Sequence, residues 1–327
     1  MIRFFSTGYL SRYLLILLIG IVVWLPSLLF PTSYSGISSY AYNQLLFIVA
    51  QNNYVITSAS FILALVTAFF LNQLAISSGF ISKVSTLVAF LYIVFTSSIV
   101  GESHNNPVIW INFIMVLVLA NLVKLPYITN SIPIVFNASF LLGIASLFYS
   151  QLVFLIFFIW VAIFIHRIVS WRNIIVSIVG VVLPYFLLLT WFFYRDILLE
   201  ESYVLFDSLR IDIAPALIKD KLNMVISSIL LSITIISVFG IAGKLTEKNI
   251  NLRRNIIITL YYIVIVFLVL LFSSKSLISV FLLGIPAVII LGHWLCNIKH
   301  TRWYNIALSL VTILIVVNQY LYLLFRL

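Results

Sequence analysis

The sequence predicts an all-α, polytopic integral membrane protein with about eleven transmembrane helices. Of its 327 residues, 64% are hydrophobic and only 8% are charged, and the mean hydropathy is +1.24. A soluble protein of this length needs more polar residues to cover its surface, so lipid must solvate much of the chain. The apolar runs are continuous and do not alternate with a period of two, which argues against a membrane β-barrel.

Each expected transmembrane helix corresponds to an apolar run of about 20 residues, the length that crosses a bilayer. The runs are residues 10–30, 54–74, 83–100, 107–124, 131–149, 151–168, 173–195, 223–243, 255–273, 276–295 and 303–325. The stretch 131–167 is too long for one crossing, because at about 1.5 Å per residue it would extend about 55 Å. The polar break at Tyr149, Ser150 and Gln151 therefore predicts a helical hairpin.

The charges of the loops predict the orientation. With the N-terminus in the cytoplasm, the inner loops contain twelve of the 18 Lys and Arg residues, and Glu247 is the single inner residue among the eight acids. An excess of Lys and Arg on the cytoplasmic side is the usual bias of membrane proteins. We therefore expect the N-terminus inside and the C-terminus outside.

We expect one transmembrane domain, residues 1–327, with two outer segments that lie along the membrane surface. Residues 31–53 combine polar residues with a short apolar face, which is typical of an interfacial helix. Residues 196–222 carry six of the eight acids, interleaved with apolar residues. They suggest an interfacial helix pair broken at Pro215, because proline interrupts a helix.

Several classes of function are disfavoured by the composition. The net charge of +10 comes from basic residues scattered at the ends of apolar runs, so we expect no nucleic-acid partner. The single cysteine, Cys296, allows no internal disulfide, and no phosphate-loop, dinucleotide-binding or zinc-binding motif occurs, so no cofactor and no metal are expected. No apolar run contains an Asp or Glu, which argues against an ion-driven transporter.

The strongest candidate site is the heptapeptide GESHNNP at residues 101–107, between the third and fourth expected helices. Glu102 is the only carboxylate before Asp196. In a functional interpretation, Glu102 and His104 are catalytic, and Asn105 and Asn106 bind substrate from the outer side. In the alternative interpretation the segment is a solvated turn, since Asn and Pro favour turns.

Two further cations on the outer side could bind the phosphate of a lipid. Lys275 stands alone in the short turn SSKS, where an ammonium group could contact phosphate as a point charge. Arg195 ends the seventh expected helix and could act similarly. Lys275 could equally extend its stem along the membrane surface with its charge in water, and Arg195 could simply pair with Asp196.

Four apolar stretches resemble a family of bacterial multi-pass membrane proteins of unknown function. They are LVTAFFLNQLAISSGF (65–80), VFNASFLLGIASLFYSQLVFLIFFIWVAIFIHR (135–167), IVSWRNIIVSIVGVVLPYFLLLTWFFY (168–194) and SLISVFLLGIPAVII (276–290). The resemblance covers most of the chain and implies a place in the bacterial cytoplasmic (inner) membrane.

The order of elements also resembles, more weakly, the GT-C glycosyltransferases, which use polyprenyl-phosphate-linked sugars. The resemblance rests on the number of helices, the long first outer loop and an acid between the third and fourth helices. It implies a catalytic role for Glu102. Those enzymes also carry acids in the first outer loop, whereas residues 31–53 contain no Asp or Glu.

Two functions therefore remain open. The first is a GT-C-like glycosyltransferase, or a degenerate relative, that acts on a polyprenyl-phosphate-linked sugar or lipid at the outer face. The second is a non-catalytic membrane component of an envelope assembly or transport complex, which would bind a protein partner through residues 31–53 and 196–222. An enzyme should gather Glu102, His104 and Lys275 around a cavity, and a scaffold should not.

Overall fold

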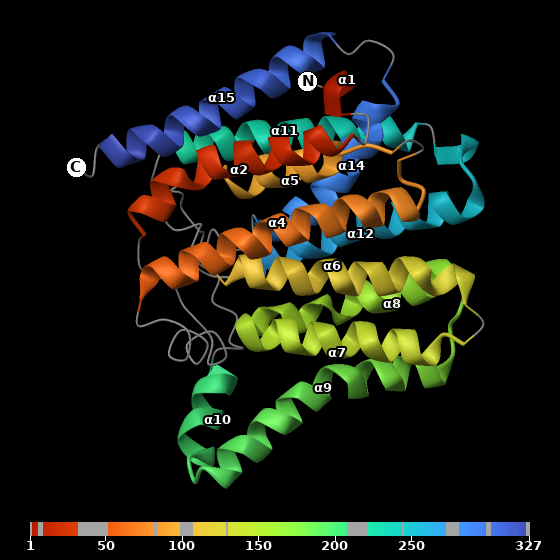
Figure 1. The fold of residues 1–327 in the computed structure, drawn as a ribbon. Helices are drawn as coiled ribbons and strands as arrows, with labels where there is room; N and C mark the ends of the chain where they lie inside the picture. The colour runs from red at the N-terminus through yellow and green to blue at the C-terminus, as the bar shows by residue number, and fades with distance from the viewer. Residues whose placement is uncertain are drawn as a thin grey trace.

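Figure 1 shows a bundle of α-helices, most of which run roughly side by side. This computed structural model describes residues 2–5, 9–31, 52–81, 84–98, 107–128, 130–207, 221–243, 245–272, 281–298 and 302–324. Within these ranges every regular element is helical, as predicted.

The longer helices are α2 (Leu10–Leu29), α4 (Asn53–Ser77), α6 (Val108–Lys124), α7 (Ile132–Phe148), α9 (Trp171–Tyr194), α11 (Lys221–Ala242), α12 (Ile250–Phe272) and α15 (Arg302–Leu324). The shorter ones are α1 (Ile2–Phe5), α5 (Leu87–Thr96), α8 (Ile156–His166), α10 (Leu198–Asp207) and α14 (Gly284–Cys296), with 3-10 turns η1 (Leu125–Tyr127), η2 (Ser150–Leu155) and η3 (Leu245–Glu247).

Seven helices of the described part are long and apolar enough to cross a membrane. They are Ser11–Leu29, Asn53–Ser77, Val108–Tyr127, Trp171–Tyr194, Leu222–Ala242, Ile250–Val269 and Arg302–Leu321. Four shorter apolar helices, Leu87–Thr96, Ile132–Phe148, Ser150–His166 and Gly284–Cys296, fall in the other four predicted runs. The helices support a multi-pass membrane protein, while the number of eleven crossings stays a prediction.

The two shortest of these apolar helices are enclosed by the others. Helix α5 has 10 residues, a rise of about 15 Å, which is half the thickness of a bilayer core. All of its residues are buried, and nearly all of α14 is buried as well. A helix enclosed by protein does not meet lipid, so its ends need not reach the membrane surface. Helix α5 is therefore shorter than the predicted run 83–100, whereas residues 276–280 of the run 276–295 lie outside the described residues.

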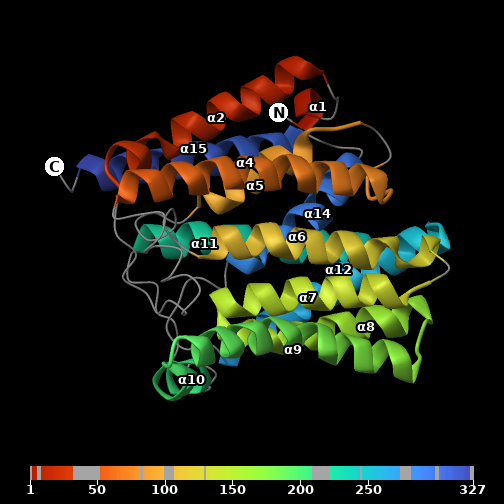
Figure 2. The same cartoon turned by 60° about the horizontal axis from the view of Figure 1, so that its bottom comes forward.

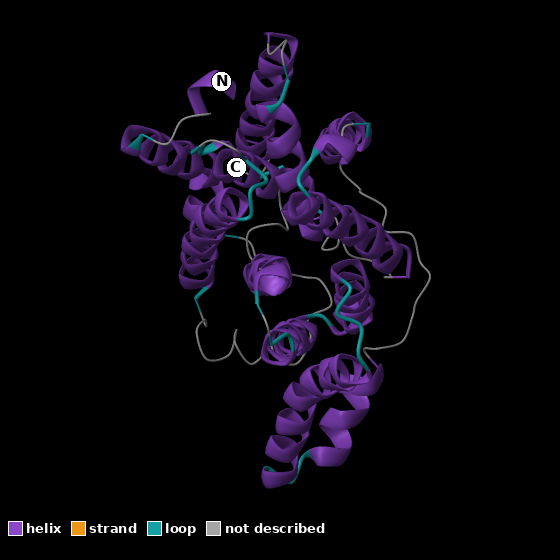
Figure 3. Cartoon of the chain, turned by 90° about the vertical axis from the view of Figure 1, so that its right-hand side faces the viewer, coloured by secondary structure: helices purple, strands orange, loops and turns teal. Residues whose placement is uncertain are grey.

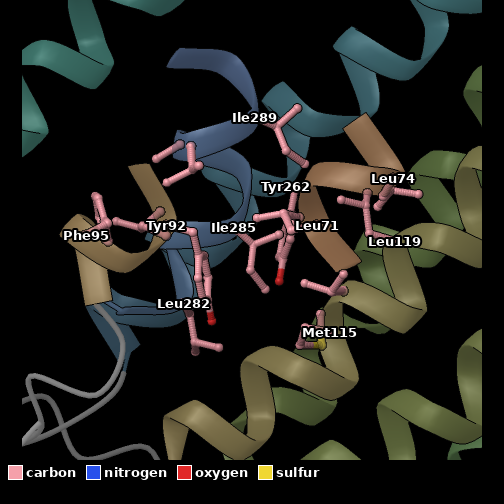
Figure 4. Packing of buried hydrophobic residues seen from close by; sticks show 14 of the residues in the cluster. Leu71, Leu74, Tyr92, Phe95, Met115, Leu119, Tyr262, Leu282, Ile285 and Ile289 are labelled. Carbon is pink, nitrogen blue, oxygen red and sulfur yellow. The ribbon is translucent and has the colours of Figure 1, made fainter. Parts of the chain in front are cut away.

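The core lies where α4, α5, α6, α12 and α14 meet. Figure 4 shows Leu71 of α4, Tyr92 of α5, Leu119 of α6 and Tyr262 of α12 converging there. All four side chains are fully buried, and the Tyr262 ring also stacks on Phe158 with ring centres 4.6 Å apart. Inside a membrane, such contacts stabilise helix association by close packing more than by the removal of water.

Helices α7 and α9 make a close contact through small residues. A Cβ added to Gly143 of α7 would lie 2.7 Å from the Val181 carbonyl oxygen of α9. A Cβ added to Gly180 of α9 would lie 2.7 Å from the Ser139 Cβ of α7. Glycine and serine let membrane helices approach until their backbones touch, and that is the arrangement here.

The predicted hairpin between the fifth and sixth runs is confirmed. Helix α7 ends at Phe148, and Tyr149 is extended, with φ −153° and ψ 103°. The Tyr149 hydroxyl donates to Gln151 Oε1 at 2.7 Å, and η2 then leads into α8. In Figure 2 α8 returns beside α7.

The expected surface segments fall partly outside the described residues. Helix α10 forms the first half of segment 196–222, and it lies beside the C-terminal end of α9, away from the other helices (Figures 1 and 2). Pro215 and almost all of segment 31–53 lie outside the described residues.

The two ends of the bundle differ in charge. We call the end where α2 begins the basic end; it faces the viewer in Figure 3 and lies on the right in Figure 1. Helices begin or end there near Lys124, Arg167, Arg172, Lys248, Arg253, Arg254 and Arg302. At the opposite end the described part has only Arg195 and Lys221 as basic residues. The described basic residues therefore lie mainly at one end, and the expected orientation, with this end inside, stays a prediction.

Cysteine labelling tests this orientation, because Cys296 is the single cysteine. In a Cys296→Ser background, we expect a membrane-impermeant maleimide to label Glu201→Cys of α10 in sealed spheroplasts. Glu247→Cys, which is exposed at the basic end, should react only after permeabilisation. The reverse pattern would place the basic end outside.

Candidate functional site

A polar network joins three helices at the opposite end of the bundle. Ser97, the C-cap of α5, accepts two hydrogen bonds: its carbonyl from Gln319 Nε2 of α15 at 2.9 Å, and its hydroxyl from Trp24 Nε1 of α2 at 3.1 Å. The three side chains are fully buried. Residues separated by up to 222 positions therefore meet at one helix end.

Two further hydrogen bonds join α6 to the chain before α14, and α15 to α11. Asn112 Nδ2 of α6 donates to the Phe281 carbonyl oxygen at 3.3 Å, and Asn318 Nδ2 of α15 donates to Asn223 Oδ1 of α11 at 2.8 Å. We call the side chains of these four hydrogen bonds the polar cluster: Trp24, Ser97, Asn112, Asn223, Asn318 and Gln319.

Local sequence explains why α5 ends inside this cluster. Thr96, Ser97 and Ser98 follow one another, and their hydroxyls donate to the carbonyl oxygens of Tyr92, Ile93 and Phe95 at 2.9, 2.7 and 2.7 Å. The Ile93 and Phe95 carbonyl oxygens also accept from the backbone N–H groups of Ser97 and Ser98, so the serine hydroxyls add a second hydrogen bond to each. The triplet thereby satisfies its own buried hydroxyl groups within the last turn of α5.

The cluster continues inward through hydroxyl groups. The Tyr92 hydroxyl lies close to Asn112 and to Thr67 of α4. Among the described residues, the Tyr92 and Tyr262 hydroxyls and Asn112 Oδ1 have no partner at hydrogen-bonding geometry. Figure 4 shows both tyrosine side chains in the same packed region. These groups have spare capacity to donate and accept hydrogen bonds.

The chemistry of the cluster is limited to neutral hydrogen bonding. Its groups are amides, an indole and hydroxyls. They can orient a bound group, but they are neutral and do not ionise near neutral pH. A catalytic acid, a catalytic base or a cation for phosphate would have to come from neighbouring segments.

The predicted residues Glu102, His104, Asn105, Asn106 and Lys275 lie outside the described residues. Described residues close to both segments take part in the hydrogen bonds of the polar cluster. Segment 99–106 follows Ser98, next to Ser97, and segment 273–280 precedes Phe281, whose carbonyl oxygen is bound by Asn112. Each segment thus adjoins one of these hydrogen bonds.

Arg195 is described, and the structure does not bring it to the polar cluster. It is the C-cap of α9 and is exposed, with its guanidinium carbon 5.0 Å from the centre of the Trp191 ring. Asp196, with φ 59°, then turns the chain toward α10. The C-terminal end of α9 lies away from α2, α5 and α15 in Figures 1 and 2.

None of the members of the polar cluster is among the site residues that the sequence predicts. Asn112 and Gln319 lie within the predicted runs 107–124 and 303–325, and polar groups at membrane depth are costly enough to merit a functional hypothesis. That signal could have identified them as candidates. Their partners could not be found in this way, because Asn112 and Phe281 are 169 positions apart.

Within the described ranges, no three His, Cys, Asp or Glu side chains group closely enough to hold a metal ion. Comparison of the chain with known protein families, curated proteins and solved structures finds no match in any of the three. The resemblances inferred from the sequence thus stay predictions, and the function has to be argued from the site.

Proposed function

We propose that this integral membrane protein binds a polyprenyl-phosphate-linked sugar at the opposite end of the bundle, on the outer face of the bacterial cytoplasmic membrane. The observation that supports this proposal is the polar cluster itself. Its hydrogen bonds hold Ser97 and Phe281, which are close in sequence to segments 99–106 and 273–280, and these segments carry Glu102, His104 and Lys275.

The proposal assigns complementary roles to these side chains. The ammonium of Lys275 binds the phosphate of the lipid, because opposite charges attract strongly beside a low-dielectric protein interior. Glu102, His104, Asn105 and Asn106 bind the hydroxyls of the sugar. Arg195, which is exposed at the end of α9, contacts phospholipid head groups there.

Glycosyl transfer would follow from the same arrangement. An acceptor hydroxyl attacks the anomeric carbon, the bond to the phosphate oxygen breaks, and polyprenyl phosphate leaves with the bonding electrons. Glu102 takes the proton of the acceptor hydroxyl, and Lys275 stabilises the charge that develops on the leaving phosphate.

Substitution of Glu102 tests the proposal. Glu102→Gln removes the charge and keeps the shape, and His104→Ala removes the imidazole. We expect each variant to lose the dependent envelope glycan while its level in the membrane is unchanged. Glu201→Gln in α10 is the matched control and should retain the glycan. Wild-type glycan in both variants, together with a phenotype of the gene deletion, would contradict the proposal.

A second function is favoured by α10. Leu199 and Tyr203 expose 86% and 69% of their surfaces on this helix, which lies away from the other helices. Exposed apolar side chains of this kind are typical of a docking surface in a non-catalytic envelope component. The double variant Leu199→Ser, Tyr203→Ser distinguishes the two functions. If this variant behaved like the gene deletion while Glu102→Gln behaved as wild type, the scaffold would be favoured.

A further inference from the structure

An apolar groove of about 200 Å³ lies between α5, α11, α14 and α15. Its walls are aliphatic and aromatic side chains, among them Phe95 of α5, Leu230 and Ile236 of α11, and Val311 of α15. In the same measure of volume a water molecule needs about 10–15 Å³, so the groove has room for on the order of ten or more such groups. A chain of methylene groups fits this space and this lining.

The groove extends along the helices. On α15 it is lined from Tyr304 to Val311, which is about 10 Å at about 1.5 Å per residue. Tyr304 belongs to the first turn of α15 at the basic end, so the groove runs from that end toward the middle of the bundle. This is the direction in which an acyl chain lies in a bilayer.

Contacts that attach α15 to the bundle lie on both sides of the groove. Toward its C-terminal end, Asn318 and Gln319 bond to α11 and to the end of α5. At its N-terminal end, the Tyr304 ring packs edge-on against Trp294 of α14, with ring centres 4.8 Å apart and an interplanar angle of 76°. The part of α15 that lines the groove lies between these two attachments. Only 17% of the residues in the apolar stretch of this helix are buried.

A second, smaller pocket of about 40 Å³ adjoins the groove and is less apolar than the groove. Trp294 lines both, and the small pocket is completed by Lys248, His293 and Asn297, among others. Gly240 of α11 makes room for Trp294, because a Cβ at this position would overlap the indole nitrogen. A tryptophan between an apolar groove and a cationic pocket is typical of the membrane interface.

We propose that the groove holds one acyl chain of an anionic phospholipid, with its phosphate beside Lys248 and Asn297. The apolar volume, its direction and the adjoining ammonium match the parts of a single amphiphile. Arg253, Arg254 and Arg302 at the same end add to the positive field. Basic pockets between membrane helices bind anionic head groups in this way. The site is independent of the function proposed above, which concerns the opposite end.

Brominated lipids test this site, because bromine on an acyl chain quenches a tryptophan that it touches. The full-length protein is exchanged into mixed micelles with brominated phosphatidylglycerol or brominated phosphatidylcholine. We expect phosphatidylglycerol to quench at lower mole fraction than phosphatidylcholine. Trp294→Phe should remove this difference, because the exposed Trp171, Trp191 and Trp303 are quenched by either lipid. Lys248→Gln should weaken the preference for phosphatidylglycerol about fivefold, the factor that corresponds to about 1 kcal/mol per lysine.

Ala307→Trp places an indole in the groove, and Leu310→Trp is its matched control, because Leu310 is 61% exposed on the same helix. Native mass spectrometry with the unbrominated lipids should show loss of the retained phospholipid in Ala307→Trp and retention in Leu310→Trp. Equal retention of the phospholipid in both variants would overturn the assignment of the groove to an acyl chain. An unchanged lipid preference in Lys248→Gln would overturn the assignment of the phosphate to Lys248. A wild-type dimer that Ala307→Trp converts to a monomer would assign the groove to a second copy and overturn the lipid proposal.

Discussion

Replacing Gly143 by alanine is expected to lower the unfolding temperature of the purified protein in detergent by several degrees. The added Cβ would lie 2.7 Å from the Val181 carbonyl oxygen and 2.8 Å from the Pro184 Cγ of α9. Neither neighbour is the end of a flexible side chain, so α7 and α9 must move apart. Overpacking of this kind costs about 1–3 kcal/mol. Gly143→Leu should prevent recovery of monodisperse protein.

The matched control is Gly20→Ala in α2. A Cβ at Gly20 would meet Leu65 and Phe61 at 3.5 Å, which is ordinary contact. Alanine is favoured over glycine within a helix by about 1 kcal/mol, so this variant should be neutral or slightly more stable. A fluorescence or light-scattering melt that ranks Gly143→Ala at or above Gly20→Ala would contradict the α7–α9 contact.

Gly180→Ala extends this test, since its Cβ would lie 2.7 Å from the Ser139 Cβ across the same contact. The effects of Gly143→Ala and Gly180→Ala should not add, because either change separates the two helices. The combined effect of two substitutions in contact typically departs from the sum of the single effects by about 0.5–3 kcal/mol. For independent sites this departure is no more than about 0.5 kcal/mol.

The sequence could predict the helical hairpin at Tyr149 but not the α7–α9 contact beyond it. Helix rise alone prevents a single crossing of stretch 131–167, so a break was required, and its polar residues mark the place. The contact depends on Gly143 lying against Val181 and Pro184, and on Gly180 lying against Phe136 and Ser139. A glycine in an apolar run can serve a bend, a turn or a close approach, and its partner is decided only by tertiary packing.

The length of α5 was unpredictable for a related reason. The run 83–100 is apolar enough for a crossing, and hydropathy does not distinguish a helix that faces lipid from one enclosed by protein. The observed helix ends at Thr96, where the hydroxyls of Thr96 and Ser97 add hydrogen bonds to carbonyl oxygens of the last turn. It packs closely on α14 at Gly284, where a Cβ would lie 2.9 Å from a Phe95 ring carbon.

The candidate site, too, could be predicted from the sequence only in part. Glu102 could be identified from sequence because a carboxylate is rare among apolar runs. The polar cluster depends on which helices meet, so Asn112 and Gln319 gained a role only from the structure. Gln319 holds Ser97 at the end of α5, close in sequence to segment 99–106, so it is a sensitive position at the opposite end.

Gln319→Leu is expected both to destabilise the protein and to impair the proposed function. Gln319 is fully buried, and its Nε2 donates to the Ser97 carbonyl oxygen at 2.9 Å. Leucine has a similar size but no donor, so it would leave this carbonyl bare. A buried unsatisfied group costs about 1–3 kcal/mol in soluble proteins, and single hydrogen bonds within membranes average about 0.6 kcal/mol. A fall of a few degrees in unfolding temperature follows.

Asn318→Leu separates the two effects. It removes the bond between α15 and Asn223 of α11 but leaves the end of α5 untouched. We expect a similar fall in unfolding temperature with the envelope glycan retained, whereas Gln319→Leu should lose the glycan as Glu102→Gln does. If both leucine variants retained the glycan at wild-type protein levels, the end of α5 would not position segment 99–106 for function. The polar cluster would then serve helix association alone.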